Sequence, residues 1–488
     1  MSFFDSHSTI EMNSTSAAGQ LRPVAVITAA QIVGMILFTI LAPRMMGPDL
    51  FGQFAVILSV LGLGQAACNI GGRFVFGRFI PEYASRGETE QVRAVFMHVL
   101  ASRLVLLLIA APVMFAFLRR LLPDASTVTL LASTTGFLAM MAGAPMYNVF
   151  FGLNRLALSM AKEPFSQYLL LVFLVALGGI TSLERASFAL LLTQTVVLGA
   201  GMLLSWRLFT LDRSAFHLPS LWQHVQFGLA VFSASLLLRI PWRLGESALA
   251  LQGVPSSEIA FFSVAISVTT AFTRVVGSAT TLLVPSLSLR QVSGDREGRD
   301  KSLGTALRYL TVAAGLFVLT VLVLAPTAVP LLLGSEYLGV LPNLYIVALA
   351  ALPAPLIRSA LSLAVVRSRL KLNFLLGGVA IVVFVLAALV LVPAYASRGA
   401  SVSLVLAIVS AGIVAALQMR RSSVLVEARL GRHLLIGAVA GCFILLAGPS
   451  PIVASVATVL YLVFLNVLAV IRWHELRQLV FARGPLRR

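Results

Sequence analysis

Charged residues are scarce in this chain of 488 residues: they make up 11% of it, whereas 59% of its residues are hydrophobic. A soluble protein of this length needs charge to cover its surface, so the composition excludes a soluble globular protein and indicates a polytopic membrane protein. Acids are the scarcer sign, with 18 Asp and Glu against 36 Lys and Arg. The basic residues lie between hydrophobic runs, where orientation in a membrane explains them better than nucleic-acid binding does.

Cysteine and lysine are also rare, and each shortage excludes a kind of site. The two cysteines, Cys68 and Cys442, lie in apolar segments far apart in the sequence, which predicts neither a disulfide framework nor a structural zinc site. The three lysines, Lys162, Lys301 and Lys371, follow Ala, Asp and Leu instead of the glycine of a phosphate-binding Walker loop. We therefore expect no cofactor, no metal and no ATP hydrolysis within this chain.

Long hydrophobic runs are what the chain has in abundance. About twenty apolar residues cross a bilayer as a helix. The candidate runs are 24–43, 52–71, 95–118, 127–151, 164–181, 186–206, 226–249, 258–286, 303–333, 341–366, 373–393, 399–419, 433–448 and 452–471. We predict an all-α polytopic membrane protein with about 14 transmembrane helices.

The basic residues predict the orientation of these spans. With the amino terminus in the cytoplasm, most Lys and Arg lie on the cytoplasmic side, which is the distribution that the positive-inside rule requires. The exceptions on the opposite side are Arg44, Arg119, Arg120, Arg185 and Arg398. Both termini are then cytoplasmic. The loops on the far side are short, such as "GPDLFG", and leave no room for the catalytic domain of a polysaccharide polymerase or ligase, so we expect no enzyme.

Matching features along the chain predict an internal repeat. Pro81 pairs with Pro285, Arg103 with Arg308, and Pro145 with Pro353 or Pro355, all at nearly the same offset. We predict two parallel six-helix bundles around a central cavity, plus two C-terminal helices. The expected domains are a tail (1–22), the first bundle (23–206), a cytoplasmic linker (207–225), the second bundle (226–419), and two extra helices with a basic tail (420–488).

The stretch "SASLLLRIPWRLGESALALQ" (233–252) places three charges inside one span. Arg239, Arg243 and Glu246 are spaced i, i+4 and i+7, so a helix carries them on one face. Each costs about 2.5–3.5 kcal/mol near a bilayer centre. Two interpretations remain open: an Arg243–Glu246 ion pair that fixes helix packing, or a water-filled cationic cavity. No other acid lies in the middle of a span, so Arg239 lacks a counter-charge, which favours the cavity.

Other residues in the spans are candidates for the same cavity, each with a structural alternative. Arg274 is expected to face the cavity, Arg358 either faces it or reaches the inner surface, and Arg103 is expected to reach that surface. Gln31, Gln65, Asn69, Tyr147 and Asn148 either bind sugar hydroxyls or join helices. Pro145, Pro241, Pro353 and Pro355 mark either gating breaks or packing kinks.

Two stretches resemble a known family. In residues 46–52, "MGPDLFG", a Gly-Pro turn follows the first span, and an arginine-rich stretch ending in "RFIPEYASRGE" follows the second. "LVPAYASRGASVS" (391–403) has Ala396 where the family usually has glycine, but keeps Gly399 and Ala400. These features resemble the Wzx-type flippases of polysaccharide repeat units, in the multidrug/oligosaccharidyl-lipid/polysaccharide (MOP) exporter superfamily.

The resemblance implies a monomeric flippase of the bacterial inner membrane. Its substrate would be an oligosaccharide linked to a prenyl diphosphate, and its partners would be membrane lipids and the polysaccharide polymerase and chain-length machinery. The arginines would meet the diphosphate, because a guanidinium stays charged in poor solvent and offers a planar fork to phosphate oxygens. A lipid II flippase of the MurJ type and a MATE-like cation-coupled drug exporter remain alternatives with the same fold.

Overall fold

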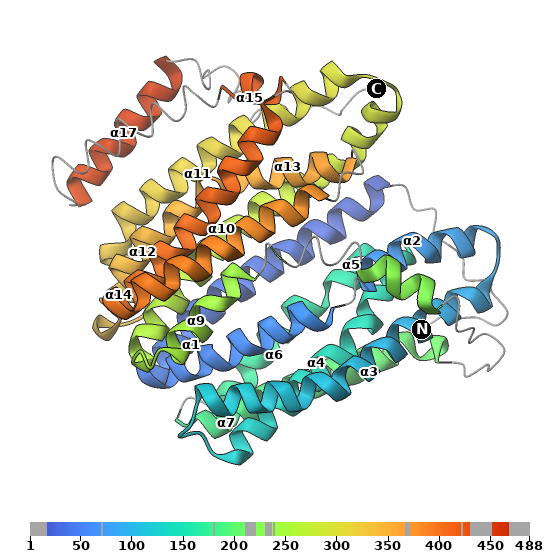
Figure 1. Ribbon diagram of the computed structural model, residues 1–488, viewed down its shortest axis with the longest axis horizontal. Coiled ribbons are helices and arrows are strands. Elements are labelled where there is room, and N and C mark those ends of the chain that lie inside the picture. The colour runs from blue at the N-terminus through green and yellow to red at the C-terminus, as the bar shows by residue number, and fades with distance from the viewer. Residues whose placement is uncertain are drawn as a thin grey trace. The chain divides into compact units, whose positions relative to one another are not determined.

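The computed structural model describes residues 17–69, 72–178, 181–209, 221–229, 237, 240–366, 371–420, 423–429 and 451–467 (Figure 1). Helices are the only regular elements in these ranges. They are α1 (Ala17–Cys68), α2 (Gly72–Ser85), α3 (Thr89–Leu121), α4 (Thr127–Gly152), α5 (Leu156–Met160), α6 (Lys162–Ala176), α7 (Leu183–Ser205), η1 (Trp206–Leu208), α9 (Pro241–Leu251), α10 (Ser256–Val292), α11 (Arg296–Leu332), η3 (Ser335–Tyr337), α12 (Val340–Ala348), η4 (Leu349–Ala351), α13 (Ala354–Val366), α14 (Lys371–Met419), α15 (Val424–Glu427) and α17 (Pro451–Val467). A further helix covers 221–229.

The prediction of an all-α membrane protein is confirmed. Eight helical segments in the described part of the chain are long and apolar enough to cross a membrane. The predicted run 433–448 lies outside the described residues, and each of the other predicted runs contains a described helix. Two helices, α1 and α14, each contain two of the predicted spans, because almost no chain separates the members of each pair.

Gly47 makes the turn inside α1 possible. Its backbone has φ 72° and ψ 165°, a region open almost only to glycine. Pro48 follows it and opens the second half of the helix with its fixed φ. Gly52 lies one turn later, and a Cβ at this position would be 1.8 Å from the backbone oxygen of Ser256. The two glycines of the "MGPDLFG" stretch therefore have different tasks, a sharp turn and a close helix approach.

The turn inside α14 has the corresponding shape without the glycine. Ala396 has φ 47° and ψ −125°, which is close to the first central position of a type II′ turn and favours glycine. The buried amide of Asn343 in α12 holds this turn: it donates to Ser397 at 2.9 Å and accepts from Ser401 at 2.9 Å. A Cβ on Gly399 would be 2.1 Å from the oxygen of Leu391, so this glycine is required by packing.

Ala396→Gly is expected to stabilise the protein by about 1 kcal/mol. The substitution removes backbone strain of about 1–3 kcal/mol from the folded state. It costs about 0.5–1 kcal/mol in return, because glycine loses more conformational entropy than alanine on folding. The thermal unfolding midpoint in detergent should rise by about 2 °C. Ala394→Gly is the matched control, because Ala394 is exposed and helical in the same segment, and it should lower the midpoint instead. An Ala396→Gly midpoint at or below wild type would contradict the strain argument.

The chain forms two compact units, residues Met1–Val264 (unit 1) and Ala265–Arg488 (unit 2), with the boundary inside α10. Corresponding glycines support the internal repeat. Gly47 and Gly253 have φ of 72° and 69°, and Gly87 and Gly294 have φ of 75° and 79°. The members of each pair stand about as far apart in sequence as Arg103 and Arg308. Left-handed turns thus recur at matching places, while the boundaries of the six-helix bundles stay a prediction.

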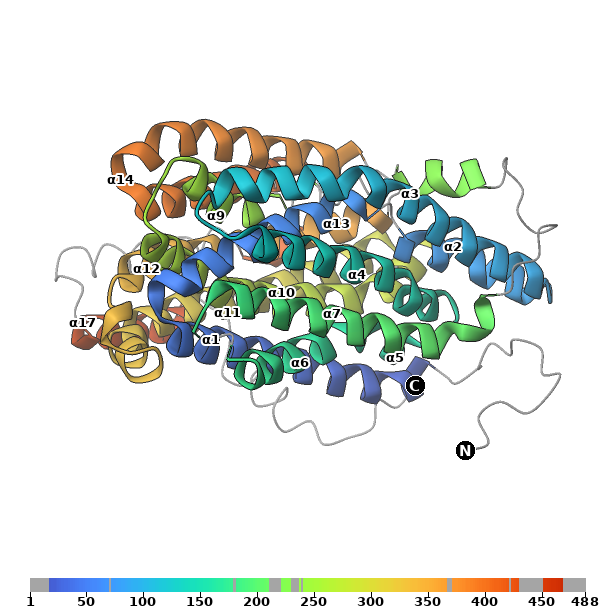
Figure 2. The same cartoon turned by 90° about the horizontal axis from the view of Figure 1, so that it is seen from below.

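Unit 1 is built around the contact of α4 with α7, which lie side by side in both views (Figures 1 and 2). Gly136 and Gly143 of α4 admit the backbone of α7, since their missing Cβ atoms would lie 3.3–3.4 Å from the Cα atoms of Leu191 and Leu198. Small residues at such spacing let membrane helices approach closely. Tyr147 closes the contact by donating its hydroxyl proton to the oxygen of Val197 at 2.9 Å.

Candidate functional site

Arg243 lies near the start of α9, which contacts α1 (Figure 1). Gly62 of α1 makes room for its stem, because a Cβ there would be 2.9 Å from the Arg243 Cδ. Ser59 fixes the backbone, since its hydroxyl donates to the oxygen of Arg243 at 2.6 Å and meets the hydroxyl of Ser247 at 2.9 Å. The guanidinium is exposed. It forms no ion pair or hydrogen bond among the described residues.

Glu246, three residues after Arg243, is buried with 5% of its surface exposed. The hydroxyl of Ser263 in α10 and its own backbone N–H donate to the carboxylate, while Oε2 has no hydrogen-bond partner. The charge of Arg243 acts on Glu246, but no Arg243–Glu246 ion pair forms within 4.0 Å in the described structure. The described structure therefore does not support the ion-pair interpretation of this stretch, and Arg243 pairs with no acid among the described residues.

Unit 2 brings two of the predicted arginines near one another. Arg274 and Gly277 lie one turn apart on α10, and the Arg358 guanidinium of α13 covers Gly277: a Cβ there would be 3.5 Å from its Cζ. Arg358 is exposed and Arg274 is partly buried, and both interact with neighbouring groups. Arg239, the remaining predicted arginine, lies outside the described residues.

The polar candidates have different positions. Asn69 accepts a hydrogen bond from Arg103 at 2.6 Å, and the buried Tyr147 joins α4 to α7, so the structure shows both of them holding helices together. Gln65 lies one turn beyond Gly62 on the face of α1 that contacts Arg243, and it is partly exposed. Gln31 and Asn148 are partly exposed as well.

The predicted prolines fall at three helix starts and one helix interior. Pro241 is the first residue of α9. Pro353 directly precedes α13, and Pro355 is its second residue, so the predicted tenth span is interrupted between α12 and α13. Pro145 is buried inside the continuous helix α4. Proline has no N–H to donate, so Pro145 leaves the carbonyl of Met141 without its usual helical partner.

The expectation that Arg103 reaches the inner surface is wrong. Arg103 is buried, with 1% of its surface exposed. Its guanidinium donates to Asn69 at 2.6 Å and to the oxygen of Met141 at 3.4 Å. Asn69 thus holds the arginine inside unit 1, where it also reaches the carbonyl freed by Pro145. Lys162 is buried beside Arg103 and donates to the oxygen of Met140 at 3.1 Å. In the sequence this lysine was notable only because it does not fit a Walker loop.

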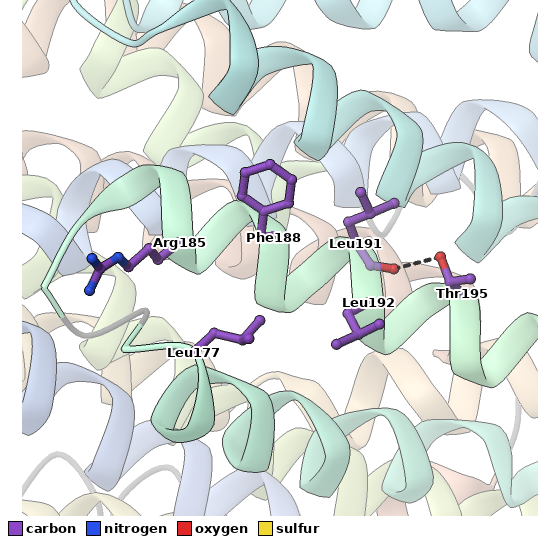
Figure 3. A pocket seen from close by; sticks show the side chains of 6 residues that line it. All are labelled: Leu177, Arg185, Phe188, Leu191, Leu192 and Thr195. Carbon is purple, nitrogen blue, oxygen red and sulfur yellow. Dashed lines mark hydrogen bonds between the residues drawn. The ribbon is translucent and has the colours of Figure 1, made fainter.

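A hollow of about 530 Å³ lies where α6 ends and α7 begins, and no sequence pattern predicted it. Figure 3 shows its lining, in which Thr195 donates to the oxygen of Leu191 at 2.9 Å and Arg185 stands at one end. The remaining lining residues are Leu177, Phe188 and Leu192. These three apolar side chains are exposed, and α7 is long and apolar enough to cross a membrane. The lining has polar side chains only at Arg185 and Thr195, so it is mostly apolar.

A buried pair of histidines joins α3 to the helix 221–229. The Nδ1 atoms of His98 and His224 are 3.2 Å apart, and the ring of Phe79 packs edge-on against His224. Burial, together with the neighbouring His98, lowers the pKa of His224 from 6.5 to about 4. His224 is therefore neutral at pH 7, and the pair holds the helix 221–229 against α3 within unit 1.

Acidification should weaken unit 1 through His224. The unfolded chain takes up a proton near pH 6.5, whereas the folded protein does so only near pH 4. Stability therefore falls as the pH drops through this interval, by about 2–3 kcal/mol at pH 4. The thermal midpoint measured from pH 7 to pH 4 should fall less in His224→Gln than in wild type. Equal pH slopes in the two proteins would contradict this assignment.

Comparison with known proteins rests on structure. No protein-family model matches the chain, and no curated protein sequence matches it. A structure of the lipid II flippase MurJ in an inward closed conformation matches with a TM-score of 0.65 and 11% identity, over 94% of this chain and 100% of that one. An inward-facing multidrug resistance MATE family transporter of the MOP superfamily matches with a TM-score of 0.57 and 15% identity, over 86% and 97%.

The chain has the fold of the MurJ and MATE transporters. A eukaryotic MATE transporter matches equally well, with a TM-score of 0.57 and 14% identity over 84% of this chain and 98% of that one. The fold that the resemblance to polysaccharide flippases implies is thereby confirmed. Identities of 11–15% establish the fold alone, because one membrane fold carries different substrates.

Proposed function

We propose that this protein is a flippase that moves a prenyl-diphosphate-linked oligosaccharide from the inner to the outer leaflet of a bacterial inner membrane. The observation that carries the proposal is the exposed guanidinium of Arg243, which forms no ion pair or hydrogen bond among the described residues. Arg243 lies in the run 226–249, which we predict to cross the membrane. An arginine facing acyl chains at this depth is costly, so its exposed side requires water or an anionic ligand. A diphosphate is the anion that a planar guanidinium binds with two parallel hydrogen bonds.

The second unit supports the same function with its own arginines. Arg274 and Arg358 flank Gly277, whose missing side chain leaves the guanidinium of Arg358 against the backbone. Several arginines spread over the predicted second bundle suit an anionic headgroup that must be passed across the membrane. Alternating access is the expected mechanism, since a MATE transporter of this fold occurs in inward-facing and outward-facing conformations.

Cation-coupled export is the second candidate, and Glu246 favours it. A buried carboxylate with an unpartnered oxygen is what a proton or sodium site offers. The two candidates differ in substrate: a drug exporter moves a cation and has no use for Arg243, whereas a flippase needs the diphosphate. Coupling through Glu246 is compatible with either substrate, so the identity of the transported substrate distinguishes the flippase from the exporter.

The test is translocation by the purified full-length protein in liposomes. A fluorescent oligosaccharide on a prenyl diphosphate is placed in the inner leaflet, and its arrival outside is followed by a membrane-impermeant quencher. We expect faster arrival than in protein-free liposomes, and none of this acceleration for the same oligosaccharide on an unphosphorylated prenol. Equal rates with and without protein, together with transport of a cationic dye, would reject the flippase in favour of the exporter.

A further inference from the structure

Two buried cations of unit 1 converge on one turn of α4. Arg103 of α3 is 1% exposed and Lys162, the first residue of α6, is 8% exposed. They donate to the carbonyl oxygens of adjacent residues, Met141 and Met140 respectively. Their positive charges are close enough to act on each other. Three helices, α3, α4 and α6, thus bring two like charges together in the interior of one unit.

Neither charge is paired with an acid among the described residues, although the charge of Glu163, next to Lys162 on α6, acts on Lys162 from outside ion-pair distance. A buried arginine elsewhere in the protein shows the usual arrangement: Arg299 is 2.6 Å from Asp300 and also donates to Gln291. Because burying an unpaired charge is costly, the cations of unit 1 require another anion.

The hydrogen bonding of Arg103 is incomplete. A guanidinium has five N–H donors. Its Nη2 donates to the Asn69 oxygen at 2.6 Å, its Nη1 reaches the Met141 oxygen at 3.4 Å, which is long for a hydrogen bond, and its Nε is buried with no partner. The backbone of Gly72, the first residue of α2, packs beside Nη2, since a Cβ there would be 3.4 Å from that atom. The weak bond to Met141 is one that an anion can replace.

We propose that Arg103, Lys162 and Asn69 form a binding site for a phosphate or diphosphate group inside unit 1. The two cations neutralise the oxyanion, the Nε and Nη1 of Arg103 donate to its oxygens, and the Asn69 amide holds the guanidinium in place. This inference deepens the proposed function and rests on it for the identity of the headgroup.

The site is tested by ligand-induced stabilisation of the full-length protein in uncharged detergent. The thermal midpoint is titrated with inorganic diphosphate, with geranyl diphosphate and with phosphatidylglycerol, at constant ionic strength and with chloride as the reference. We expect a saturable rise in wild type. Arg103→Gln and Lys162→Met should each weaken the apparent affinity by at least about tenfold. Arg93→Gln is the control, since Arg93 lies on the same helix and pairs with Glu90 at 2.8 Å.

Asn69→Asp gives a second measurement that does not depend on removing a buried cation. The new carboxylate lies where Arg103 already donates, so it should raise the midpoint of the ligand-free protein and abolish the rise with diphosphate. A larger response to geranyl diphosphate than to inorganic diphosphate assigns the site to the prenyl-linked headgroup. A response to phosphatidylglycerol alone assigns it to membrane phospholipid.

The inference is overturned if no phosphate probe stabilises wild type, or if Arg103→Gln and Lys162→Met respond as wild type does. Its failure is separable from failure of the proposed function. Diphosphate binding without oligosaccharide translocation would keep the site and reject the flippase, whereas translocation by a protein that binds no diphosphate at Arg103 would do the reverse.

Discussion

Alanine at both Arg239 and Arg243 is expected to abolish display of surface polysaccharide without lowering the amount of protein in the membrane. Each arginine would supply charge-assisted hydrogen bonds to the diphosphate, worth about 1.5–3 kcal/mol. Arg243→Ala alone should therefore slow translocation by about 10-fold to 100-fold. Protein abundance should hold, because Arg243 makes no ion pair or hydrogen bond through its guanidinium in the described structure.

Two further variants sharpen this prediction. Arg243→Lys keeps the charge but loses the planar fork, so it should retain part of the rate. Arg86→Ala is the matched control, since Arg86 is exposed and pairs with Glu82 at 3.1 Å near the end of α2, and it should leave the rate unchanged. Full polysaccharide display by a stably expressed Arg239→Ala, Arg243→Ala protein would contradict the role of these arginines.

Gly52→Ala is expected to cause the largest loss of stability. The added Cβ would be 1.8 Å from the oxygen and 2.5 Å from the carbonyl carbon of Ser256. These are backbone atoms, so no side-chain rotation relieves the clash and the start of α10 must move away from α1. We expect a cost of at least about 3 kcal/mol and a strong decrease in the amount of folded protein in the membrane.

The control for Gly52→Ala is a glycine in equally apolar surroundings. Gly199 lies inside α7, and a Cβ there would meet nothing within 4 Å. Gly199→Ala should leave stability unchanged or raise it by up to about 1 kcal/mol, because alanine restricts the unfolded chain. Thermal midpoints of the two purified variants decide the matter. Equal midpoints would mean that the contact at Ser256 yields without cost.

Much of the fold followed from the sequence because the membrane leaves few choices. Backbone groups in hydrocarbon must be satisfied internally, so every long apolar run becomes a helix. The turn at Gly47 could be predicted for the same reason, because "MGP" between two apolar runs indicates a sharp turn between two helices. The close contacts of Gly52 and Gly399 could not be predicted, because each glycine packs against a backbone oxygen whose position the sequence does not reveal.

The contacts of the site were predicted less well than its residues. Helical spacing placed Arg243 and Glu246 on one face, and both lie in α9, but spacing did not reveal that Ser263 bonds the carboxylate or that Gly62 packs against the arginine stem. Arg103 was expected at the surface because arginines near span ends often reach it. Its actual partners, Asn69 and the Met141 carbonyl, are brought together by packing and by the missing N–H of Pro145, so periodicity could not reveal them.

The tight turns at Gly47 and Ala396 also determine where the chain is accessible to proteases, antibodies and inserted tags. A turn of one or two residues exposes no extended loop that a protease could cleave or an antibody could bind. An epitope tag inserted at either point would have to force two tightly apposed helices apart. Probes of membrane topology are better introduced at residues 122–126, where α3 passes into α4 through a short turn, since the chain there has room to accommodate them.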